Sequence, residues 1–257
     1  MIDLHCHILP TVDDGAGSIQ DSLTMAKQAE EEGIHTIVAT PHHKNGKYEN
    51  DKASILTDVE ALNAVFKKEQ VDIKVLPGQE VRVYGDLLKD YQLGHILTMN
   101  DTGKYLFIEF PSAQVPRITD NLLYSLQLEG VIPVIVHPER NQKIIEKPNI
   151  LYEIVKQGAL TQITTSSLTG VFGKKIQKFS YDLIEANLTH FIASDAHNTT
   201  TRPFNVQNAL TTIEKKFGTE WANILKTNAE YVVEGKTFYK ESPQRIKKKK
   251  IFSFLRG

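Results

Sequence analysis

The sequence predicts a single-domain α/β fold, a parallel barrel related to the eight-stranded (β/α) TIM type and either distorted or short by one strand. The chain has 257 residues, which suits one large domain with a sizeable core. Short runs rich in Val, Ile, Phe and Thr alternate along it with amphipathic stretches of helical period. Because this alternation favours parallel strands with right-handed crossovers, we expect a barrel, with an open doubly wound sheet as the alternative.

The apolar runs have the length and composition of buried strands. In chain order they cover Met1–His7, Thr36–Thr40, Ile73–Val81, Tyr105–Phe110, Ile132–His137, Leu160–Thr164 and Thr189–Ser194.

The amphipathic stretches between these runs are expected to form helices. Ser18 and Asp21 give the first of them a start like a capping box, and Gly33 is expected to end it. The stretches cover Ser18–Glu32, Lys52–Glu69, Thr119–Glu129, Asn149–Gln157, Lys174–Ala186 and Pro203–Phe217.

The C-terminal segment differs from the rest of the chain in being strongly basic. No linker or repeat divides the chain before it, so we expect one barrel over residues 1–240 and a flexible tail over residues 241–257. Residues 245–256 combine a run of lysines with large apolar side chains. A solvated tail explains this pattern best. Weak membrane proximity, through anionic lipid or a membrane-bound partner, is the alternative.

Composition excludes several classes of protein. A single cysteine, Cys6, rules out an intrachain disulfide framework and suits a reducing compartment. The N-terminus lacks a signal-peptide pattern, because Asp3 and His5 stand where apolar residues are needed, and no apolar run is long enough to span a membrane. The formal net charge is -1 and no basic stripe is present, so we do not expect the protein to bind nucleic acid. We therefore expect a cytoplasmic protein.

Histidine and acidic residues recur where the predicted strands end. In parallel α/β folds the carboxyl ends of the strands gather at one face, where active sites form. Residues that are far apart in the sequence would therefore converge. The strand-end residues of metal-ligand type are His5, His7, His42, His43, Glu80, Glu109, His137, Asp195 and His197.

Each of these features is weak by itself. A His5-x-His7 pair on a strand places both imidazoles on one face, but such pairs are as often structural as functional. A lone buried glutamate is as easily explained by a salt bridge. The recurrence of such residues at six strand ends favours a functional site.

The residue types indicate a multinuclear metal centre. Imidazoles and carboxylates suit Mn, Zn, Fe or Mg better than Cu(I) or an iron–sulfur cluster. They are too numerous for one tetrahedral ion, so two or three ions are expected. Ions held roughly 3.5–4 Å apart activate water and stabilise the attacking and leaving oxygens of phosphoryl transfer. Cys6 lies between His5 and His7 and should point to the opposite face of the strand, which indicates a packing role.

Two arginines accompany these residues. Arg140 follows His137-Pro138-Glu139, and Arg202 follows His197 by five positions. A guanidinium fork is well matched to phosphate oxygens. A local ion pair, such as Arg140 with Glu139, is the other interpretation, and the residues alone leave both open.

The motifs together resemble a known family. They are His5-Cys6-His7, Asp13-Asp14-Gly15, Ala39-Thr40-Pro41-His42-His43, Gly78-Gln79-Glu80, Glu109-Phe110-Pro111, His137-Pro138-Glu139-Arg140 and Ser194-Asp195-Ala196-His197. Over residues 1 to about 235 the sequence resembles the PHP (polymerase and histidinol phosphatase) family of metal-dependent phosphoesterases. It is most similar to the bacterial manganese-dependent protein-tyrosine phosphatases of Gram-positive capsule and exopolysaccharide loci.

The resemblance implies a distorted (β/α)7 barrel that holds two or three metal ions, usually manganese. The implied ligand sets are His5, His7, Glu80 and Asp195 for the first ion, Glu80, Glu109 and His137 for the second, and Asp14, His42 and His197 for the third. Asp13 is the alternative to Asp14. The implied catalytic residues are Arg140, Arg202 and Asp195, with both arginines as phosphate binders.

The implied activity is hydrolysis of phosphotyrosine by a metal-activated hydroxide. The implied substrates are an autophosphorylated bacterial tyrosine kinase with a tyrosine-rich C-terminal tail and the protein substrates of that kinase. This activity would regulate capsule or exopolysaccharide synthesis. A histidinol phosphatase, or another small-molecule phosphomonoesterase, is the alternative. A non-catalytic interaction module would have lost ligands, and none is lost here.

A thiol-based mechanism does not fit the sequence. The Cys-x5-Arg loop of thiol-dependent tyrosine phosphatases is absent. Five residues separate Cys6 from position 12, where that loop has its arginine, and this chain has Val12 there. A cysteine beside the predicted centre is therefore not expected to act as the nucleophile.

Overall fold

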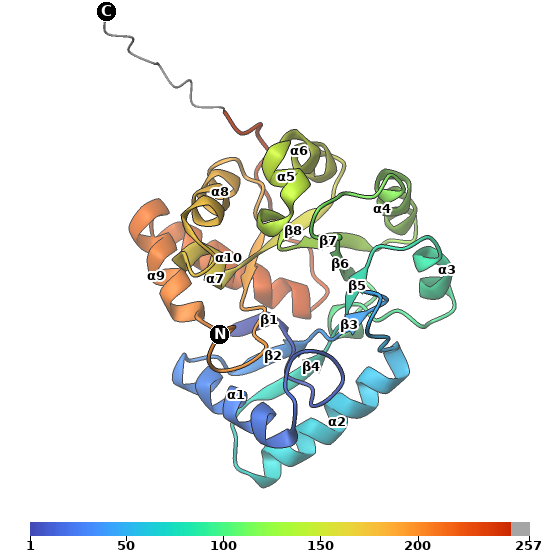
Figure 1. Cartoon of the computed structure of the whole chain (residues 1–257), viewed down its shortest axis with the longest axis vertical. Coiled ribbons are helices and arrows are strands. Elements are labelled where there is room, and N and C mark those ends of the chain that lie inside the picture. The colour runs from blue at the N-terminus through green and yellow to red at the C-terminus, as the bar shows by residue number, and fades with distance from the viewer. Residues whose placement is uncertain (248–257) are drawn as a thin grey trace, which may run out of the picture.

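Parallel strands form the centre of the molecule, and helices surround them (Figure 1). The structure is a computed structural model and describes residues 1–247. Its strands are β1 (Ile2–Cys6), β2 (Thr36–Ala39), β3 (His42–His43), β4 (Lys74–Pro77), β5 (Glu80–Arg82), β6 (Tyr105–Glu109), β7 (Ile132–Val136), β8 (Leu160–Thr164) and β9 (Phe191–Ala193).

The helices lie between successive strands or after the last one. They are α1 (Ile19–Glu31), α2 (Lys52–Lys68), α3 (Leu87–Gln92), α4 (Thr119–Leu128), α5 (Gln142–Glu146), α6 (Asn149–Lys156), α7 (Thr165–Thr169), α8 (Lys174–Glu185), α9 (Val206–Phe217) and α10 (Thr219–Val233), with short 3-10 turns η1 (Met99–Asp101) and η2 (Pro138–Arg140). Within the described residues, no helix is both long and apolar enough to cross a membrane.

One of the predicted strands is shortened and another is interrupted. The run predicted over Thr36–Thr40 ends at Ala39, and β3 follows after Pro41. The run predicted over Ile73–Val81 splits into β4 and β5 around Gly78, where a Cβ atom would lie 2.7 Å from Val38 Cγ1. Glu80 therefore begins a strand, and the prediction that it ends one was wrong.

These breaks divide the strands between two sheets. One sheet has the order β1-β2-β4 and the other β3-β5-β6-β7-β8-β9, and every neighbouring pair is parallel. Since β2 continues into β3 and β4 into β5, there are seven strand positions, as predicted. The parallel α/β architecture predicted from the strand–helix alternation is confirmed.

Hydrogen bonds between the end of β1 and the segment that follows β9 join the two ends of this strand order. The backbone N–H of Asp195 donates to the His5 carbonyl at 2.8 Å, and that of His7 donates to the Ala196 carbonyl at 2.9 Å. The buried Asp3 carboxylate accepts hydrogen bonds from both the backbone N–H and the hydroxyl of Ser194. Segments almost two hundred positions apart in the chain are thereby held side by side.

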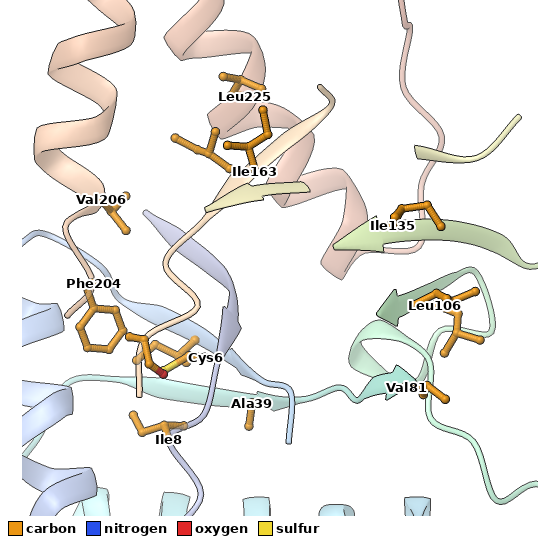
Figure 2. Packing of buried hydrophobic residues seen from close by; sticks show 14 of the residues in the cluster. Cys6, Ile8, Ala39, Val81, Leu106, Ile135, Ile163, Phe204, Val206 and Leu225 are labelled. Carbon is orange, nitrogen blue, oxygen red and sulfur yellow. The ribbon is translucent and has the colours of Figure 1, made fainter. Parts of the chain in front are cut away.

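The core has two parts, because alternate residues of each strand face opposite sides. Along β6, Leu106 and Ile108 pack in a large cluster with residues of the helices. Tyr105 and Phe107 belong to a second cluster, which consists mainly of strand residues and the inner face of α10. Figure 2 shows part of the larger cluster, which includes Cys6.

The sequence predicted the larger helices closely but missed several others. Ser18 caps α1 by accepting a hydrogen bond from the Asp21 N–H, and Gly33 follows the helix with a φ of 76°. The missed elements α3, α5 and α7 have five or six residues and owe their stability to tertiary contacts. Helix α10 is longer, and its apolar residues do recur at helical spacing.

Part of the predicted basic tail lies outside the described residues, namely residues 248–257. Immediately before it, Arg245 pairs with Glu153 at 2.5 Å, and its guanidinium lies 4.3 Å from the centre of the Tyr152 ring.

The loop after β1 is packed tightly against the end of that strand. A Cβ atom on Gly15 would lie 2.0 Å from the His7 carbonyl oxygen and 2.4 Å from His7 Cβ. The same carbonyl accepts a hydrogen bond from the Ala16 N–H at 3.0 Å. Only glycine therefore allows the loop to turn back over His7.

We predict that Gly15→Ala lowers the free energy of unfolding by about 1–3 kcal/mol, because the clash is with backbone and cannot be relieved by a side-chain rotation. Urea denaturation measures this change. Gly17→Ala is the matched control, since its nearest contact would be the flexible Asp21 carboxylate at 3.4 Å. Equal stabilities of the two variants would contradict the prediction.

Candidate metal centre and active site

The predicted ligand residues converge at the carboxyl ends of the strands. They come from the end of β1 and the loop after it, from β3, β5 and β6, and from the segments that follow β7 and β9. Three groups of these side chains place ligand atoms within 4.8 Å of one another. Residues separated by up to nearly two hundred positions thus form one cluster, as the strand-end pattern predicts.

The first group contains His5, His7, Glu80 and Asp195. The Nε2 atoms of the two histidines lie 3.3 Å apart. Each lies 3.3 Å from Glu80 Oε2 and 3.4–3.5 Å from Asp195 Oδ1. Atoms that surround a tetrahedral ion at ~2.1 Å are separated by about 3.4 Å, and the two histidine nitrogens have this spacing from each other, from Glu80 Oε2 and from Asp195 Oδ1.

The second group lies around Glu80 and Glu109. His137 Nε2 is 2.7 Å from Glu80 Oε1, and the resemblance implies both residues as ligands of one ion. His42 Nδ1 also faces this group, at 2.9 Å from Glu80 Oε2 and 3.8 Å from Glu109 Oε2. Glu109 is additionally held by Arg82, whose Nε and Nη2 atoms both lie 2.9 Å from Glu109 Oε2.

The third group distinguishes Asp14 from its neighbour Asp13. Asp14 Oδ1 lies 3.4 Å from His42 Nε2 and 3.5 Å from His197 Nε2. Asp13 instead accepts a hydrogen bond from His7 Nδ1 at 2.6 Å. The structure therefore brings Asp14 into the ligand group and places Asp13 behind His7.

Hydrogen bonds on the far side of the rings orient three of the histidines. His7 Nδ1 binds Asp13, His5 Nδ1 lies 3.0 Å from Gln162 Oε1, and His197 Nδ1 lies 3.0 Å from the Asp195 carbonyl oxygen. Such partners fix the tautomer and leave Nε2 free to bind a metal. Sequence reasoning missed Gln162, although a polar residue within the buried β8 strand was a readable signal.

The backbone is unusual at two of the predicted ligand residues. His137 has a φ of 37° and Asp195 has a φ of 54°, so both adopt left-handed conformations directly after a strand. Such conformations are unfavourable for residues with a Cβ atom, and they cluster at functional sites. Here they direct the side chains into the shared cluster.

The electrostatics of the cluster are those of a site built to hold cations. Burial and the neighbouring Glu80 carboxylate raise the pKa of Glu109 to about 7. Burial also disfavours ionisation of Glu80, but the histidines around it outweigh this effect and hold its pKa well below the usual range. Burial, with Arg140 nearby, lowers the pKa of His137 to about 4, so this imidazole is neutral and available to bind a metal.

Unpaired ligand atoms give an independent test of this fit. Among the described residues, Glu80 Oε2, His42 Nδ1 and His197 Nε2 are buried and make no well-oriented hydrogen bond, although His42 Nδ1 and Glu80 Oε2 lie 2.9 Å apart. Buried polar atoms are normally satisfied, and these three all face the ligand groups. Divalent metal ions would satisfy them, so the residues present fit a metal centre.

Both arginines bind the same carboxylate oxygen. Arg140 Nη2 lies 2.7 Å and Arg202 Nη2 lies 2.8 Å from Asp195 Oδ2. Arg140 does not form the alternative ion pair with Glu139. Glu139 instead accepts hydrogen bonds from the Thr164 N–H and the Ser167 hydroxyl. Burial opposes ionisation of Asp195, but Arg140, His5 and Arg202 outweigh it and hold the pKa of Asp195 well below its usual range.

A cavity of about 530 Å³ opens beside the cluster. Arg140, Arg202, Asp195, Glu109, His42 and His137 line one part of it. Both guanidinium groups therefore border a space large enough for a small anionic group.

Cys6 is excluded from this cavity. It is fully buried, belongs to the larger hydrophobic cluster and donates from its thiol to the Ala196 carbonyl oxygen at 3.6 Å. Burial raises the pKa of this thiol well above its usual value. The predicted packing role is confirmed, and a reactive thiolate is disfavoured.

Comparison with known proteins agrees with this geometry. The family model described as "Capsular polysaccharide synthesis, CpsB/CapC" matches residues 1–234. The chain belongs to the CpsB/CapC family. The resemblance to phosphatases of capsule loci that the motifs indicated is thereby confirmed.

Two relatives of this chain carry names that state an activity. The tyrosine-protein phosphatase YwqE of Bacillus subtilis is 51% identical over 255 residues, which covers 99% of this chain and 100% of its own length. The tyrosine-protein phosphatase CpsB of Streptococcus pneumoniae is 31% identical over 230 residues, which covers 88% of this chain and 94% of its own length.

A solved structure shares the fold along almost the whole chain. It comes from crystal structures of YwqE from Bacillus subtilis and CpsB from Streptococcus pneumoniae, described as unique metal-dependent tyrosine phosphatases. The TM-score is 0.94 at 50% identity, covering 96% of this chain and 100% of that chain.

We predict that metal binding at Glu109 displaces a proton. In the metal-free protein the pKa of Glu109 is about 7, so the group is largely protonated at pH 6. Only the carboxylate binds a metal, and affinity should therefore rise with pH until Glu109 is ionised. Titration calorimetry with MnCl2 at pH 6, in buffers of different ionisation enthalpy, counts the protons released.

In Glu109→Gln this count should fall by up to about one proton relative to the unmodified chain. The control is Glu49→Gln, because Glu49 is an exposed residue that pairs with Lys44. If Glu109→Gln releases as many protons as the unmodified chain, Glu109 does not couple to the metal.

Proposed function

We propose that this chain is a metal-dependent protein-tyrosine phosphatase, a phosphoric monoester hydrolase. The observation that carries the proposal is the convergence of buried imidazoles, carboxylates and two guanidinium groups on one cavity. The names of its relatives support phosphotyrosine as the substrate, in preference to histidinol phosphate or another small phosphomonoester.

In this proposal the three groups of side chains hold two or three divalent ions, of which manganese is the expected one. His5, His7, Glu80 and Asp195 surround one position, and His42 and His137 serve the positions on either side of Glu80. When bound, such ions supply an activated water and neutralise phosphate charge. The protein must then position the phosphate and the leaving group.

Arg140 and Arg202 perform the positioning of the phosphate. Asp195 Oδ2 binds one nitrogen of each guanidinium, which fixes both side chains before substrate arrives. Preorganised donors of this kind stabilise charge that develops on the phosphoryl oxygens during hydrolysis. Because Asp195 is held in its ionised form, it is better suited to anchoring the arginines than to donating a proton.

The leaving group makes limited demands on the protein. A tyrosine phenol has a pKa near ~10, so its phenolate departs with less acid assistance than a serine or threonine alkoxide. This agrees with a site whose described carboxylates are mostly ionised.

The physiological substrates we propose are a bacterial tyrosine kinase, autophosphorylated on a tyrosine-rich tail, and the protein substrates of that kinase. The family description supports a role in capsular polysaccharide synthesis. Such kinases act at the membrane, and the basic segment 241–257 would hold the phosphatase weakly near the anionic lipid surface.

Hydrolysis of a phosphotyrosine peptide tests the proposed activity directly. The chain should release phosphate when MnCl2 is present, and the release should stop when the metal is chelated.

We predict that Arg140→Ala or Arg202→Ala lowers kcat/KM by about a hundredfold, because each removes a charged donor to the phosphate. Arg245→Ala is the matched control, since Arg245 pairs with Glu153 away from the cavity. Full activity in either active-site variant would refute the assigned role of that arginine, and failure to hydrolyse the peptide would refute the substrate.

We also predict that Cys6→Ala retains kcat within about threefold of the unmodified chain while lowering Tm, because the thiol packs in the core and does not react. Steady-state kinetics and thermal denaturation measure the two effects. A variant that is folded but inactive would instead indicate covalent thiol catalysis.

A further inference from the structure

The cavity beside the candidate metal centre has a second, apolar part that the proposed chemistry does not use. Phe110, Phe172 and Ile176 belong to it, and they share the cavity lining with the arginines and Asp195. Phe110 follows β6, Ile176 lies in the first turn of α8, and Phe172 stands on the loop between α7 and α8. A single cavity therefore joins phosphate-binding groups to an aromatic wall.

Phe172 is held against the arginine that faces the phosphate. The guanidinium carbon of Arg140 lies 5.5 Å from the centre of the Phe172 ring, within the range of a cation–π contact. The ester oxygen of an aryl phosphate joins the phosphoryl group directly to a ring. A phosphate bound by Arg140 would therefore place such a ring near Phe172, whereas an alkyl phosphate has only a methylene group at that position.

Local helix capping does not explain why an aromatic residue stands here. Gly173 is the N-cap of α8, so Phe172 precedes the cap. A hydrophobic staple would require an apolar partner at the fourth helical position, which is the polar Gln177. Phe172 also remains only half-buried.

The backbone of the loop is shaped to present this side chain. Gly170 and Gly173 flank Val171 and Phe172, and both glycines have positive φ values, 86° and 92°. Such values are readily adopted only by glycine. Val171 is 56% exposed and does not line the cavity, whereas its neighbour Phe172 does line it. The loop therefore places Val171 in solvent and Phe172 in the cavity wall.

From these observations we propose that Phe172, supported by Phe110 and Ile176, forms an aryl-binding subsite that selects phosphotyrosine over phosphoserine and phosphothreonine. This inference rests on the proposed function, since it names the part of the same cavity that recognises the tyrosine ring. An aromatic contact stabilises the bound ring and leaves the binding of a small alkyl phosphate unchanged. Phe172 is thus a specificity-determining residue, distinct from the arginines that hold the phosphate.

Binding of two phosphonates to the manganese-loaded protein separates the ring from the phosphate. Phenylphosphonate carries both groups, whereas methylphosphonate carries only the phosphate-like part. Titration calorimetry should show that Phe172→Ala weakens phenylphosphonate binding about tenfold, while methylphosphonate binding changes less than about twofold. Val171→Ala is the matched control from the same loop and should bind both ligands as the unmodified chain does.

Several outcomes overturn the inference. It fails if the unmodified chain binds the two phosphonates equally, if Phe172→Ala affects both ligands alike, or if it affects neither. Phe172→Leu keeps most of the side-chain volume without the ring, and it replaces the alanine variant if circular dichroism shows that the latter is unfolded. A leucine variant with undiminished preference for phenylphosphonate would equally overturn the inference.

Kinetics on peptides distinguish this inference from the proposed function. If the unmodified chain hydrolyses phosphotyrosine peptide but Phe172→Ala keeps the same kcat/KM ratio between phosphotyrosine and phosphoserine peptides, the subsite is wrong and the phosphatase activity stands. If phenylphosphonate binding depends on Phe172 but phosphotyrosine peptide is not hydrolysed, the subsite stands and the proposed activity is wrong.

Discussion

The junction between β9 and β1 is the constraint on which the site depends. Backbone hydrogen bonds there place Asp195 and His197 directly beside His5 and His7, although the two segments are almost two hundred residues apart. The buried pair of Asp3 and Ser194 reinforces the contact. Four of the candidate ligand side chains therefore have positions that follow from one parallel strand pairing, and none of them relies on a flexible surface loop.

Concentrating so many ionisable groups in one place would be unfavourable if their charges were not matched. Burial penalises each carboxylate, and the pKa of Glu109 is raised to about 7 for this reason. The pKa of Glu80 is not raised but held well below its usual range, because histidines from several strands surround this carboxylate. The cluster is thus balanced partly by its own imidazoles and arginines, while atoms of Glu80, His42 and His197 that make no well-oriented hydrogen bond are suited to binding divalent cations.

Asp195 connects the two functions of the cavity. One of its oxygens faces the histidine pair, and the other binds Arg140 and Arg202. Its left-handed backbone conformation after β9 makes this double orientation feasible. In the proposed function, a metal centre and a phosphate site that share one carboxylate would be held in a fixed spatial relation, which is what in-line phosphoryl transfer requires.

The sequence by itself determined the parallel α/β class, the approximate position of the strands and larger helices, and the set of residues that meet at the strand ends. These features are encoded locally, in hydrophobic period and in the placement of polar residues relative to it. The packing role of Cys6 was also predictable from the sequence, because side chains alternate along a strand and Cys6 therefore points to the opposite face from His5 and His7. Tertiary structure alone decided that Asp14 faces the His42 ring while Asp13 binds the His42 backbone N–H, that both arginines share Asp195, and that Gln162 orients His5. Such choices depend on rotamers and on contacts between distant segments, and neither leaves a periodic signal in the chain.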